Sequence, residues 1–386
     1  MKLLLLNWGA YTQQDIVDTL KEHGVSVKEI SYCFGDKNQD DYFYRHFSKY
    51  VTADDYDAVF TVNYFPLIAQ VCYEKQVKYL SWSYDNPLNV LQIEDTLGYP
   101  TNYVFLFDRL QALSYQSKGF SNVYHLPLAV NPNRLSKLTL SKDEWEKYTS
   151  EITLVGDLYA SNFNHILFHL DDYHKGYLKA VAEAQLKVYG YYFLNDILTD
   201  DLLKEVNNSM VTKLNTQDFQ ISREQLSYAM ATDITRQERL ILLNLLSKRH
   251  QVTLYSREQH PLLSQVAFKG SAKYYTEMYQ IFKASKINLN ITLKILQTGM
   301  PLRTLDVLGA GGFLLSNYQE ELMTNFIPDE DLVLYSSIED AVEKASYYLS
   351  HNELREEIAQ NGCRKVCENF NYHKQLTSLF KQSGLI

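Results

Sequence analysis

The chain has 386 residues, 46% of them hydrophobic and 22% charged, with a formal net charge of −9 at pH 7; this composition excludes a disordered chain and fits two or three globular domains. The negative charge argues against a nucleic-acid partner, because phosphate backbones select clustered Lys and Arg. Four cysteines are too few for a disulfide scaffold at this length and suit a reducing compartment.

Short apolar strands alternate with amphipathic helices over the first 130 residues. We expect strands at 2–7, 25–32, 58–62, 77–82, 103–107 and 122–126, and helices at 13–23, 65–75 and 109–118. Gly24 follows the first helix, in the position where glycine commonly ends helices. This alternation predicts a parallel sheet with helices on both faces.

A second strand-rich part begins after the charged helical stretch 141–148. We place the domain boundary there, giving an N-terminal domain 1–148 and a C-terminal domain 149–370. A strand is expected at 151–155 and a helical elaboration over 163–249, clearest at 226–231 and 239–248. The alternation then resumes with strands at 251–255, 287–291, 313–316 and 332–335 and helices at 274–284, 303–308, 337–350 and 352–361. The predicted fold is α/β, with two Rossmann-like doubly wound domains in tandem.

Polar residues follow several of the predicted strands. Parallel sheets bind ligands beyond the carboxyl ends of their strands, and with two such domains the cleft between them is the expected site. The residues in these positions are Asn7, Trp8, Gly9, Asn63, Tyr64, Asp85, Asn86, Asp108, Gly156 and Asp157. Each of them could also be a turn residue or a helix cap: Asp108 directly precedes the helix at Arg109, as an N-cap would.

The stretch 285–316 carries the most information about function. A strand, a loop with Gly299 and Pro301, a helix, a glycine turn and another strand follow in order. The loop N–H groups and the helix N-terminus can hold an anion. Arg303 in the first helical turn fits a diphosphate better than it fits the helix dipole. Asp306, one turn further on, could accept hydrogen bonds from ribose hydroxyls, although the pair could also be a surface ion pair.

Other functional motifs are missing from the sequence. It contains neither the phosphate-binding P-loop pattern nor the dinucleotide-binding glycine fingerprint. Asp55-Tyr56-Asp57 precedes its strand, and Cys363 and Cys367 have no second cysteine pair to complete a zinc site. We therefore expect no metal and no organic cofactor.

Two sets of segments resemble a known family, the CgeB-like or spore-maturation-type bacterial glycosyltransferases. Residues 56–63, 79–82, 84–87, 107–108 and 125–129, with Pro66 and Cys72, resemble the N-terminal domain of these proteins. Residues 285–290, 299–306, 309–316, 348–349, 358–359 and 361–362, with Arg355, resemble the catalytic domain.

This resemblance implies a GT-B fold with two Rossmann-like domains facing a central cleft. The first domain would recognise the acceptor and the second the nucleotide-sugar donor, without a D-x-D metal site, and a last helix within 371–386 would pack back on the first domain. In the related family 4 retaining enzymes, an E-x7-E motif places its second Glu on the ribose and its first near the sugar. Asp306 stands in the second place here and Thr298 in the first.

The resulting hypothesis is a metal-independent glycosyltransferase that uses a nucleoside-diphosphate sugar, most simply a UDP-sugar. The acceptor would be a hydroxyl of a surface polysaccharide, glycolipid or protein, with retention of configuration favoured over inversion. The expected donor-binding residues are Lys286, Asn288, Thr298, Gly299, Pro301, Arg303, Asp306, Tyr255, Tyr274 and Gly156, with Tyr275 an alternative to Tyr274 for stacking on the base. Asn7, Trp8, Gly9, Asn63 and Tyr64 would line the acceptor side. Asp85 or Asp108 would be the base of an inverting reaction.

Rival functions are a GT-B sugar-nucleotide epimerase or phosphorylase, and a sugar- or nucleotide-binding coat protein without turnover. An epimerase would release its product without any acceptor. No apolar run is long enough for a membrane span, so we expect a cytoplasmic protein for which peripheral membrane contact is possible.

Overall fold

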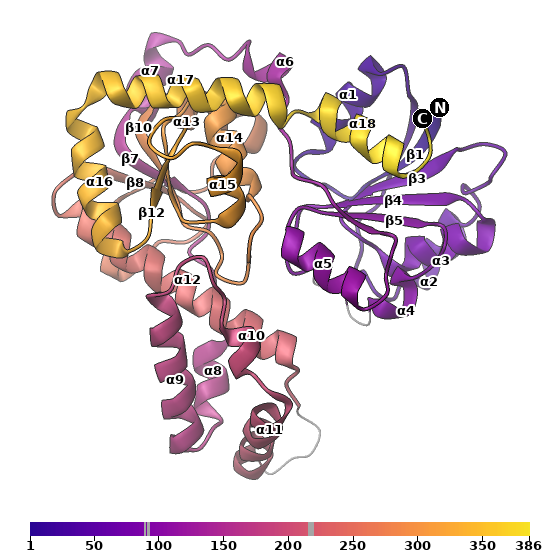
Figure 1. Ribbon diagram of the computed structural model, residues 1–386, viewed down its shortest axis with the longest axis horizontal. Helices are drawn as coiled ribbons and strands as arrows, with labels where there is room; N and C mark the ends of the chain where they lie inside the picture. Colours follow the sequence, from indigo (N-terminus) through magenta and orange to yellow (C-terminus); the bar gives the residue numbers. More distant parts are fainter. Residues whose placement is uncertain (89, 91–92, 215–219) are drawn as a thin grey trace. The chain divides into compact units, whose positions relative to one another are not determined.

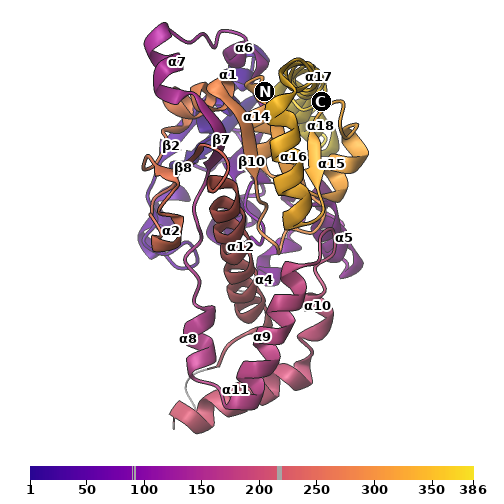
Figure 2. The ribbon, with the colours of Figure 1, turned by 90° about the vertical axis from the view of Figure 1, so that its left-hand side faces the viewer.

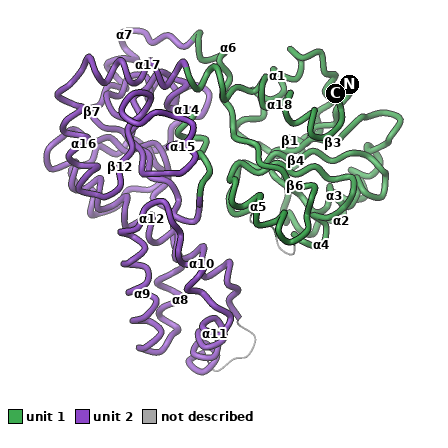
Figure 3. The backbone as a smooth tube through the Cα atoms, viewed as in Figure 1, with its two compact units in different colours: residues 1–137, 298–305, 365–386 green, residues 138–297, 306–364 purple. Residues whose placement is uncertain are grey.

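The computed structural model describes the whole chain except residues 89, 91–92 and 215–219. The chain forms two compact units, each assembled from separate stretches of sequence (Figure 3). Unit 1 contains residues 1–137, 298–305 and 365–386, and unit 2 contains residues 138–297 and 306–364.

Unit 1 is built on a six-stranded sheet of the described residues, in the order β2-β1-β3-β4-β5-β6. Its strands are β1 (Lys2–Asn7), β2 (Ser26–Ser31), β3 (Ala58–Val62), β4 (Lys78–Ser83), β5 (Asn102–Leu106) and β6 (Val123–His125), and all neighbours are parallel. The four leucines of β1 are fully buried, as expected for a central strand that is covered on both faces.

Helices cover both faces of this sheet. They are α1 (Gln13–Glu22), α2 (Asp41–Phe47), α3 (Pro66–Lys75), α4 (Glu94–Leu97), α5 (Arg109–Ser117), α6 (Pro132–Leu135) and α18 (Tyr372–Gln382). The last of these, α18, lies beside α1 (Figure 1), and Lys78 Nζ donates to the carbonyls of Ser383 at 2.7 Å and Gly384 at 3.0 Å. The apolar face of α18, with Leu376, Leu379 and Phe380, is buried.

Unit 2 has a second parallel sheet, in the order β12-β11-β10-β7-β8-β9. The strands are β7 (Ser150–Val155), β8 (Val252–Tyr255), β9 (Ala267–Phe268), β10 (Ser285–Asn290), β11 (Leu314–Asn317) and β12 (Val333–Tyr335). Its neighbouring strands are parallel as well. Strands that follow β7 in the chain therefore lie on either side of it, β8 on one and β10 on the other.

The helices of unit 2 form two groups. Those near the sheet are α7 (Lys142–Tyr148), α13 (Tyr279–Ala284), α14 (Leu302–Gly309), α15 (Glu320–Asn325), α16 (Ile338–Ser350) and α17 (Asn352–Asn369), with a 3₁₀ turn η1 (Pro261–Leu263) and a π-helical turn η2 (Tyr274–Met278). Two of these helices cross the unit boundary: 302–305 of α14 and 365–369 of α17 belong to unit 1.

The second group is the helical extension, which we define as residues 163–222 with the first half of α12. It contains α8 (Phe163–Phe168), α9 (Asp172–Leu186), α10 (Leu194–Ile197) and α11 (Asp200–Leu214), packed around their own apolar cluster. Helix α12 (Arg223–Ser247) runs from this cluster to the sheet (Figure 2). Residues 215–219 of the predicted elaboration lie outside the described part.

The compact units differ from the predicted domains at the boundary after residue 148. Helix α7 packs on α13 of unit 2, where Gln280 Nε2 donates to Glu144 at 2.7 Å and Lys147 lies 3.4 Å from Glu277. Residues 138–148 therefore join the second unit. The predicted C-terminal domain also loses 298–305 and 365–370 to unit 1.

Candidate functional site

The strand order reverses at the carboxyl ends of β7 and β10, which is where open parallel sheets bind ligands. Gly156 and Tyr159 follow β7 with φ angles of +156° and +62°. A left-handed conformation is uncommon for a tyrosine. The loop after β7 thus takes an unusual path directly above the reversal.

Arg239 of α12 bridges the two strand ends at this point. Its Nη1 donates to the carbonyl of Asp157 after β7, and its Nη2 to the carbonyl of Ile291 after β10. The Tyr159 ring lies 4.5 Å from its guanidinium carbon. The residue is 6% exposed, and its Nε has no acceptor among the described residues. A buried guanidinium with a spare donor at a ligand-binding edge is suited to an anion.

Two more arginines surround the same loop. Arg236 Nη1 donates to the Tyr159 carbonyl at 2.8 Å and to Glu258 at 3.0 Å, while Arg257 pairs with the Asp157 carboxylate. Burial acts to raise the pKa of Asp157, but hydrogen bonds from Arg257 outweigh burial and hold this pKa below its usual value. Sequence reasoning missed all three arginines. Two lie in a segment expected to be only a helical elaboration.

Asp306 is buried beneath a pair of tyrosines. Its Oδ1 accepts hydrogen bonds from Tyr279 at 2.8 Å and Tyr274 at 3.1 Å, and the two hydroxyls are 2.9 Å apart. Tyr274 is thus tied to Asp306 by its hydroxyl, with its ring edge-on to those of Tyr275 and Tyr279. The predicted roles of Asp306 on a ribose and of Tyr274 on a base stay predictions.

Substitutions of Asp306 separate a ribose contact from a structural role. Asp306→Asn keeps an acceptor for the tyrosine hydroxyls, so we expect a nearly unchanged melting temperature with weaker UDP binding. Asp306→Ala removes the acceptor of the buried Tyr279 hydroxyl, which costs about 1–3 kcal/mol. Calorimetric titration with UDP and thermal melting of both variants provide the measurements. Normal UDP affinity in Asp306→Asn would contradict the ribose assignment.

The loop with Thr298 and Gly299 is held by Asp108 inside unit 1. Oδ1 of this fully buried carboxylate accepts from Gln111 N at 3.1 Å and Thr298 Oγ1 at 2.9 Å. Oδ2 accepts from the N–H groups of Thr298 at 3.1 Å and Gly299 at 3.3 Å. The geometry favours the capping alternative for Asp108 over the general base. The two N–H groups expected to hold a diphosphate are already bound to this carboxylate.

The rest of this loop leads into α14. A Cβ on Gly299 would lie 2.9 Å from the Phe107 carbonyl oxygen, so only glycine allows so close an approach. Pro301 accepts hydrogen bonds from Thr304 N at 3.0 Å and Thr304 Oγ1 at 2.7 Å. Arg303 is half-buried in the first turn of α14.

Lys286 and Asn288 do not lie at the carboxyl edge. Lys286 is the second residue of β10, and its Nζ is 3.8 Å from Glu151 near the start of β7. It is therefore at the opposite edge of the sheet. Asn288 is buried inside the strand, where its amide donates to the carbonyls of Phe282 at 2.9 Å and Phe313 at 3.3 Å. Both expectations are wrong because Lys286 and Asn288 lie within β10, before its carboxyl end. Which residues form that end depends on pairing with the neighbouring strands.

Tyr255 does stand at the carboxyl end of β8, paired with Val155. Its side chain is buried, and burial raises the pKa of its hydroxyl. Gly156 N donates to the Tyr255 carbonyl at 2.9 Å, which ties the loop after β7 to this strand. The stacking role of Tyr255 stays a prediction.

The carboxyl edge of the first sheet brings together most of the residues expected on the acceptor side. Asn63, with φ +66°, accepts from the N–H groups of Tyr84 at 2.7 Å and Asp85 at 3.2 Å, and its amide donates to Asp85 Oδ2 at 2.7 Å. Desolvation raises the pKa of Asp85, against the opposing effects of Lys37 and Asn63. A carboxylate with a raised pKa that still reaches solvent suits a general base.

Asn7 ends β1, and Trp8 and Gly9 follow it at the same edge. Gly9 N donates to Asn7 Oδ1 at 3.1 Å, and Trp8 Nε1 donates to the Val62 carbonyl at 2.7 Å. Lys37 Nζ lies 4.7 Å from the centre of the Trp8 ring. Tyr64, by contrast, is a core residue: it is 2% exposed and its hydroxyl donates to Thr96 at 2.9 Å. The expectation that Tyr64 lines an acceptor site is therefore wrong.

The comparisons with known proteins agree with this architecture. A family model described as glycosyl transferase-like matches residues 236–381. A glycosyltransferase from Rickettsia africae superimposes with a TM-score of 0.60 at 8% identity, over 99% of this chain and 98% of that one. The fold is that of the GT-B glycosyltransferases.

Two further GT-B structures cover the whole chain. Sucrose-phosphate synthase from Thermosynechococcus elongatus has a TM-score of 0.57 at 12% identity, over 100% of this chain and 99% of that one. HepE from Anabaena, solved in complex with UDP-glucose, has a TM-score of 0.53 at 11% identity, over 100% of both chains. No curated protein matches the sequence.

The described residues contain neither a cluster of metal ligands nor a membrane-spanning helix. No group of three or more His, Cys, Asp or Glu side chains that could hold a metal ion occurs among them, and the expected metal independence stays a prediction. In the same part of the chain, no helix combines the length and apolar character needed to cross a membrane.

Proposed function

We propose that this protein is a glycosyltransferase that moves a sugar from a nucleoside-diphosphate sugar, with UDP as the nucleotide, to a hydroxyl acceptor. The observation that carries the proposal is Arg239, a buried guanidinium with a spare Nε donor at the strand-order reversal of unit 2. The family match over residues 236–381 supports it, as does the presence of UDP-glucose and of UDP in the similarly folded HepE structures.

The chemistry that we propose is the replacement of one glycosidic bond by another. The bond from the anomeric carbon to the diphosphate oxygen breaks, and a bond to the acceptor oxygen forms. Arg239 would stabilise the negative charge that develops on the departing diphosphate, and the diphosphate contact of Arg303 stays a prediction from the sequence. The acceptor proton would pass to the departing phosphate oxygen if configuration is retained, which we favour, or to Asp85 if it is inverted.

The finer assignments belong to the same proposal. We propose a CgeB-like protein related to family 4 enzymes, independent of metal, acting in the cytoplasm on a surface polysaccharide, glycolipid or protein. The free state of all four cysteines supports a reducing compartment. Asp306 in the second acidic position of the E-x7-E motif supports the family 4 relation, and Thr298 in the first sets the chain apart from it.

The first experiment is a thermal-shift assay of the purified protein with UDP, GDP, dTDP and CMP. A ligand that binds only the folded state raises the melting temperature by mass action, and we expect UDP to give the largest shift. Release of free sugar from UDP-glucose without an acceptor would then show turnover. Isomerisation of the sugar nucleotide would indicate an epimerase instead. Absence of any shift at millimolar nucleotide would overturn the proposal.

Replacing Arg303 tests the diphosphate contact. A hydrogen bond to a charged group contributes about 1.5–3 kcal/mol, so Arg303→Ala should lower kcat/KM for UDP-glucose hydrolysis about 10- to 150-fold. Arg364→Ala serves as the matched control, since Arg364 is an exposed arginine on α17. An unchanged kcat/KM in folded Arg303→Ala protein would remove Arg303 from the site.

A further inference from the structure

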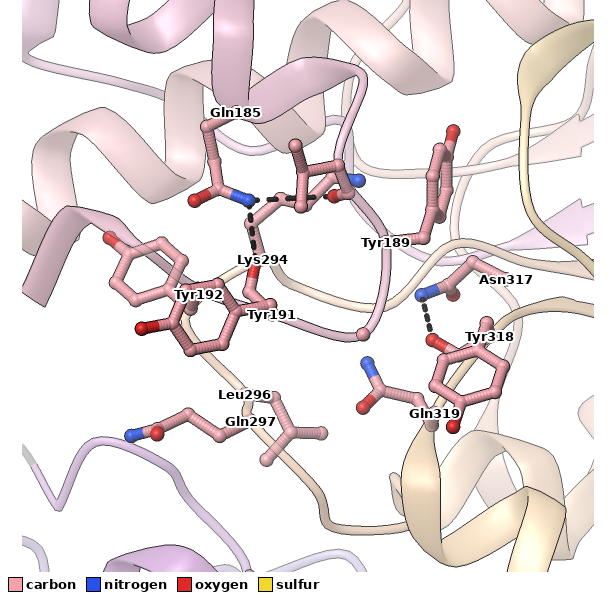
Figure 4. A pocket seen from close by; sticks show the side chains of 12 residues that line it. Gln185, Tyr189, Tyr191, Tyr192, Lys294, Leu296, Gln297, Asn317, Tyr318 and Gln319 are labelled. Carbon is pink, nitrogen blue, oxygen red and sulfur yellow. Dashed lines mark hydrogen bonds between the residues drawn. The ribbon is translucent and has the colours of Figure 1, made fainter.

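A small polar pocket lies in unit 2 between the helical extension and the second sheet (Figure 4). Three segments form its walls: residues 185–192 at the end of α9 and just after it, residues 294–297 after β10, and residues 317–319 at the end of β11. It therefore lies beyond the carboxyl ends of two strands, on the side where this fold binds ligands. Its volume is about 20 Å³, and one water-sized group needs about 10–15 Å³.

The pocket contains a buried acceptor that lacks a donor. Gln319 is 5% exposed, and its Oε1 is buried without a hydrogen-bond partner among the described residues. Figure 4 shows its amide turned toward the space inside the ring of labelled side chains. A buried unsatisfied acceptor is costly, so this atom requires a donor such as a hydroxyl or a water molecule.

The charges around the pocket favour a neutral group. Lys294 contributes to the wall, but its Nζ lies 2.9 Å from Glu238 Oε2 and 3.9 Å from the centre of the Tyr189 ring. Glu238 is fully buried and also accepts from the hydroxyls of Tyr189 at 2.9 Å and Tyr335 at 3.2 Å. The charge of Lys294 is thus balanced inside the protein. A carboxylate or phosphate would find no net positive charge in this pair, whereas a hydroxyl needs none.

The walls are held in place by the rest of the structure. Gln185 accepts from Phe193 N at 2.9 Å and donates to the Tyr191 carbonyl at 2.9 Å, which fixes the turn after α9. Gly190, with φ +76°, allows the Tyr318 ring to pack so closely that a Cβ would lie 2.6 Å from it. The pocket is therefore preformed, as ligand-binding sites usually are.

We infer that Gln319 Oε1 accepts a hydrogen bond from a hydroxyl of the donor sugar, in a pocket that residues 185–192 of the helical extension help to enclose. This inference rests on the proposed function. A hydroxyl matches the size of the pocket, its charge balance and its unpaired acceptor. An acceptor sugar has the same chemistry, so the test must separate the two sources.

The test compares the dissociation constants of UDP and of UDP-sugars by calorimetric titration. The panel is UDP, UDP-glucose, UDP-galactose and UDP-xylose, measured on wild type, on Gln319→Met and on Gln360→Met as the control, because Gln360 is exposed on α17. For the sugar that wild type prefers, Gln319→Met should lower the ratio Kd(UDP)/Kd(UDP-sugar) about five- to tenfold. The Kd of UDP and the control should stay unchanged.

Further arms separate the possible failures. An unchanged melting temperature, together with an unchanged Kd of UDP, shows that a lowered ratio in Gln319→Met does not come from misfolding. An unchanged ratio in Gln319→Met means that the pocket holds only water, which overturns the inference and leaves the proposed function intact. If Gln319→Met weakens only the binding of free glucose to the UDP complex, the hydroxyl belongs to the acceptor sugar. This result also overturns the inference. Failure of wild type to bind UDP overturns the proposed function and the inference together.

Discussion

Lys294→Met is expected to lower the free energy of unfolding of unit 2 by about 3–5 kcal/mol, the usual cost of leaving a buried charge unpaired. Lys294 and Glu238 have side-chain exposures of 6% and 0%. Without the ammonium group, the Glu238 carboxylate keeps only the hydroxyls of Tyr189 and Tyr335. For a domain of this size the loss corresponds to a drop of roughly 6–20 °C in melting temperature.

A double variant shows that the effect comes from the charge. Lys294→Met with Glu238→Gln removes both charges while the amide still accepts from the tyrosine hydroxyls, so most of the lost stability should return. Lys142→Met is the control: the pair between Lys142 and Glu146 is highly exposed, and its loss should cost less than about 1 kcal/mol. A loss below 1 kcal/mol in Lys294→Met would show that the pair contributes little.

Asp108→Asn should release the loop at Thr298 and Gly299. An amide nitrogen in place of Oδ2 cannot accept from the two backbone N–H groups, and each buried donor left unsatisfied costs about 1–3 kcal/mol. We therefore expect a loss of about 2–6 kcal/mol and much faster hydrogen exchange at both amides. Activity should fall as well, because Arg303 follows this loop directly in α14.

The pH profile of activity distinguishes a structural role of Asp108, as a clamp that holds the loop at Thr298 and Gly299, from a role as a catalytic base. A general base gives kcat/KM an acidic limb that disappears when the base is removed, whereas a clamp lowers activity at every pH alike. Asp40→Asn is the matched control, because Asp40 caps α2 of the same unit by accepting from Phe43 N and asparagine caps helices equally well. Exchange at Thr298 and Gly299 should be normal in this control. Loss of the acidic limb in Asp108→Asn would restore the general-base assignment.

Alternating apolar strands and amphipathic helices predicted both sheets, because most of the strands are buried inside a parallel sheet. The elements missed were those with weak periodicity. Strand β9 has only two residues, too few to show a pattern. Helix α12 looked like two segments because Thr232 and Thr235 interrupt it. In the structure their hydroxyls bond to the carbonyls of the preceding turn, at Tyr228 and Ala231, so the helix continues.

The candidate site was predictable only where it depends on local sequence. The loop glycine, Arg303 and Asp306 follow from a strand-loop-helix pattern within some twenty residues. The pairing of Lys294 with Glu238, and the bridge from Arg239 to the ends of β7 and β10, join segments more than fifty residues apart. Contacts between residues so far apart in the chain leave no periodic pattern in the sequence by which they could be predicted. The only available signal was charge on the otherwise apolar face of α12.

The division of unit 1 among three stretches of sequence affects the order in which the chain folds during its synthesis. Helix α18 covers α1 with a buried apolar face, yet residues 365–386 leave the ribosome after all of unit 2. Domains usually fold in the order of synthesis, but here the first unit to emerge is completed last. Until then the nascent chain exposes the surface that Leu376, Leu379 and Phe380 will cover, and that surface is a natural place for a chaperone to bind.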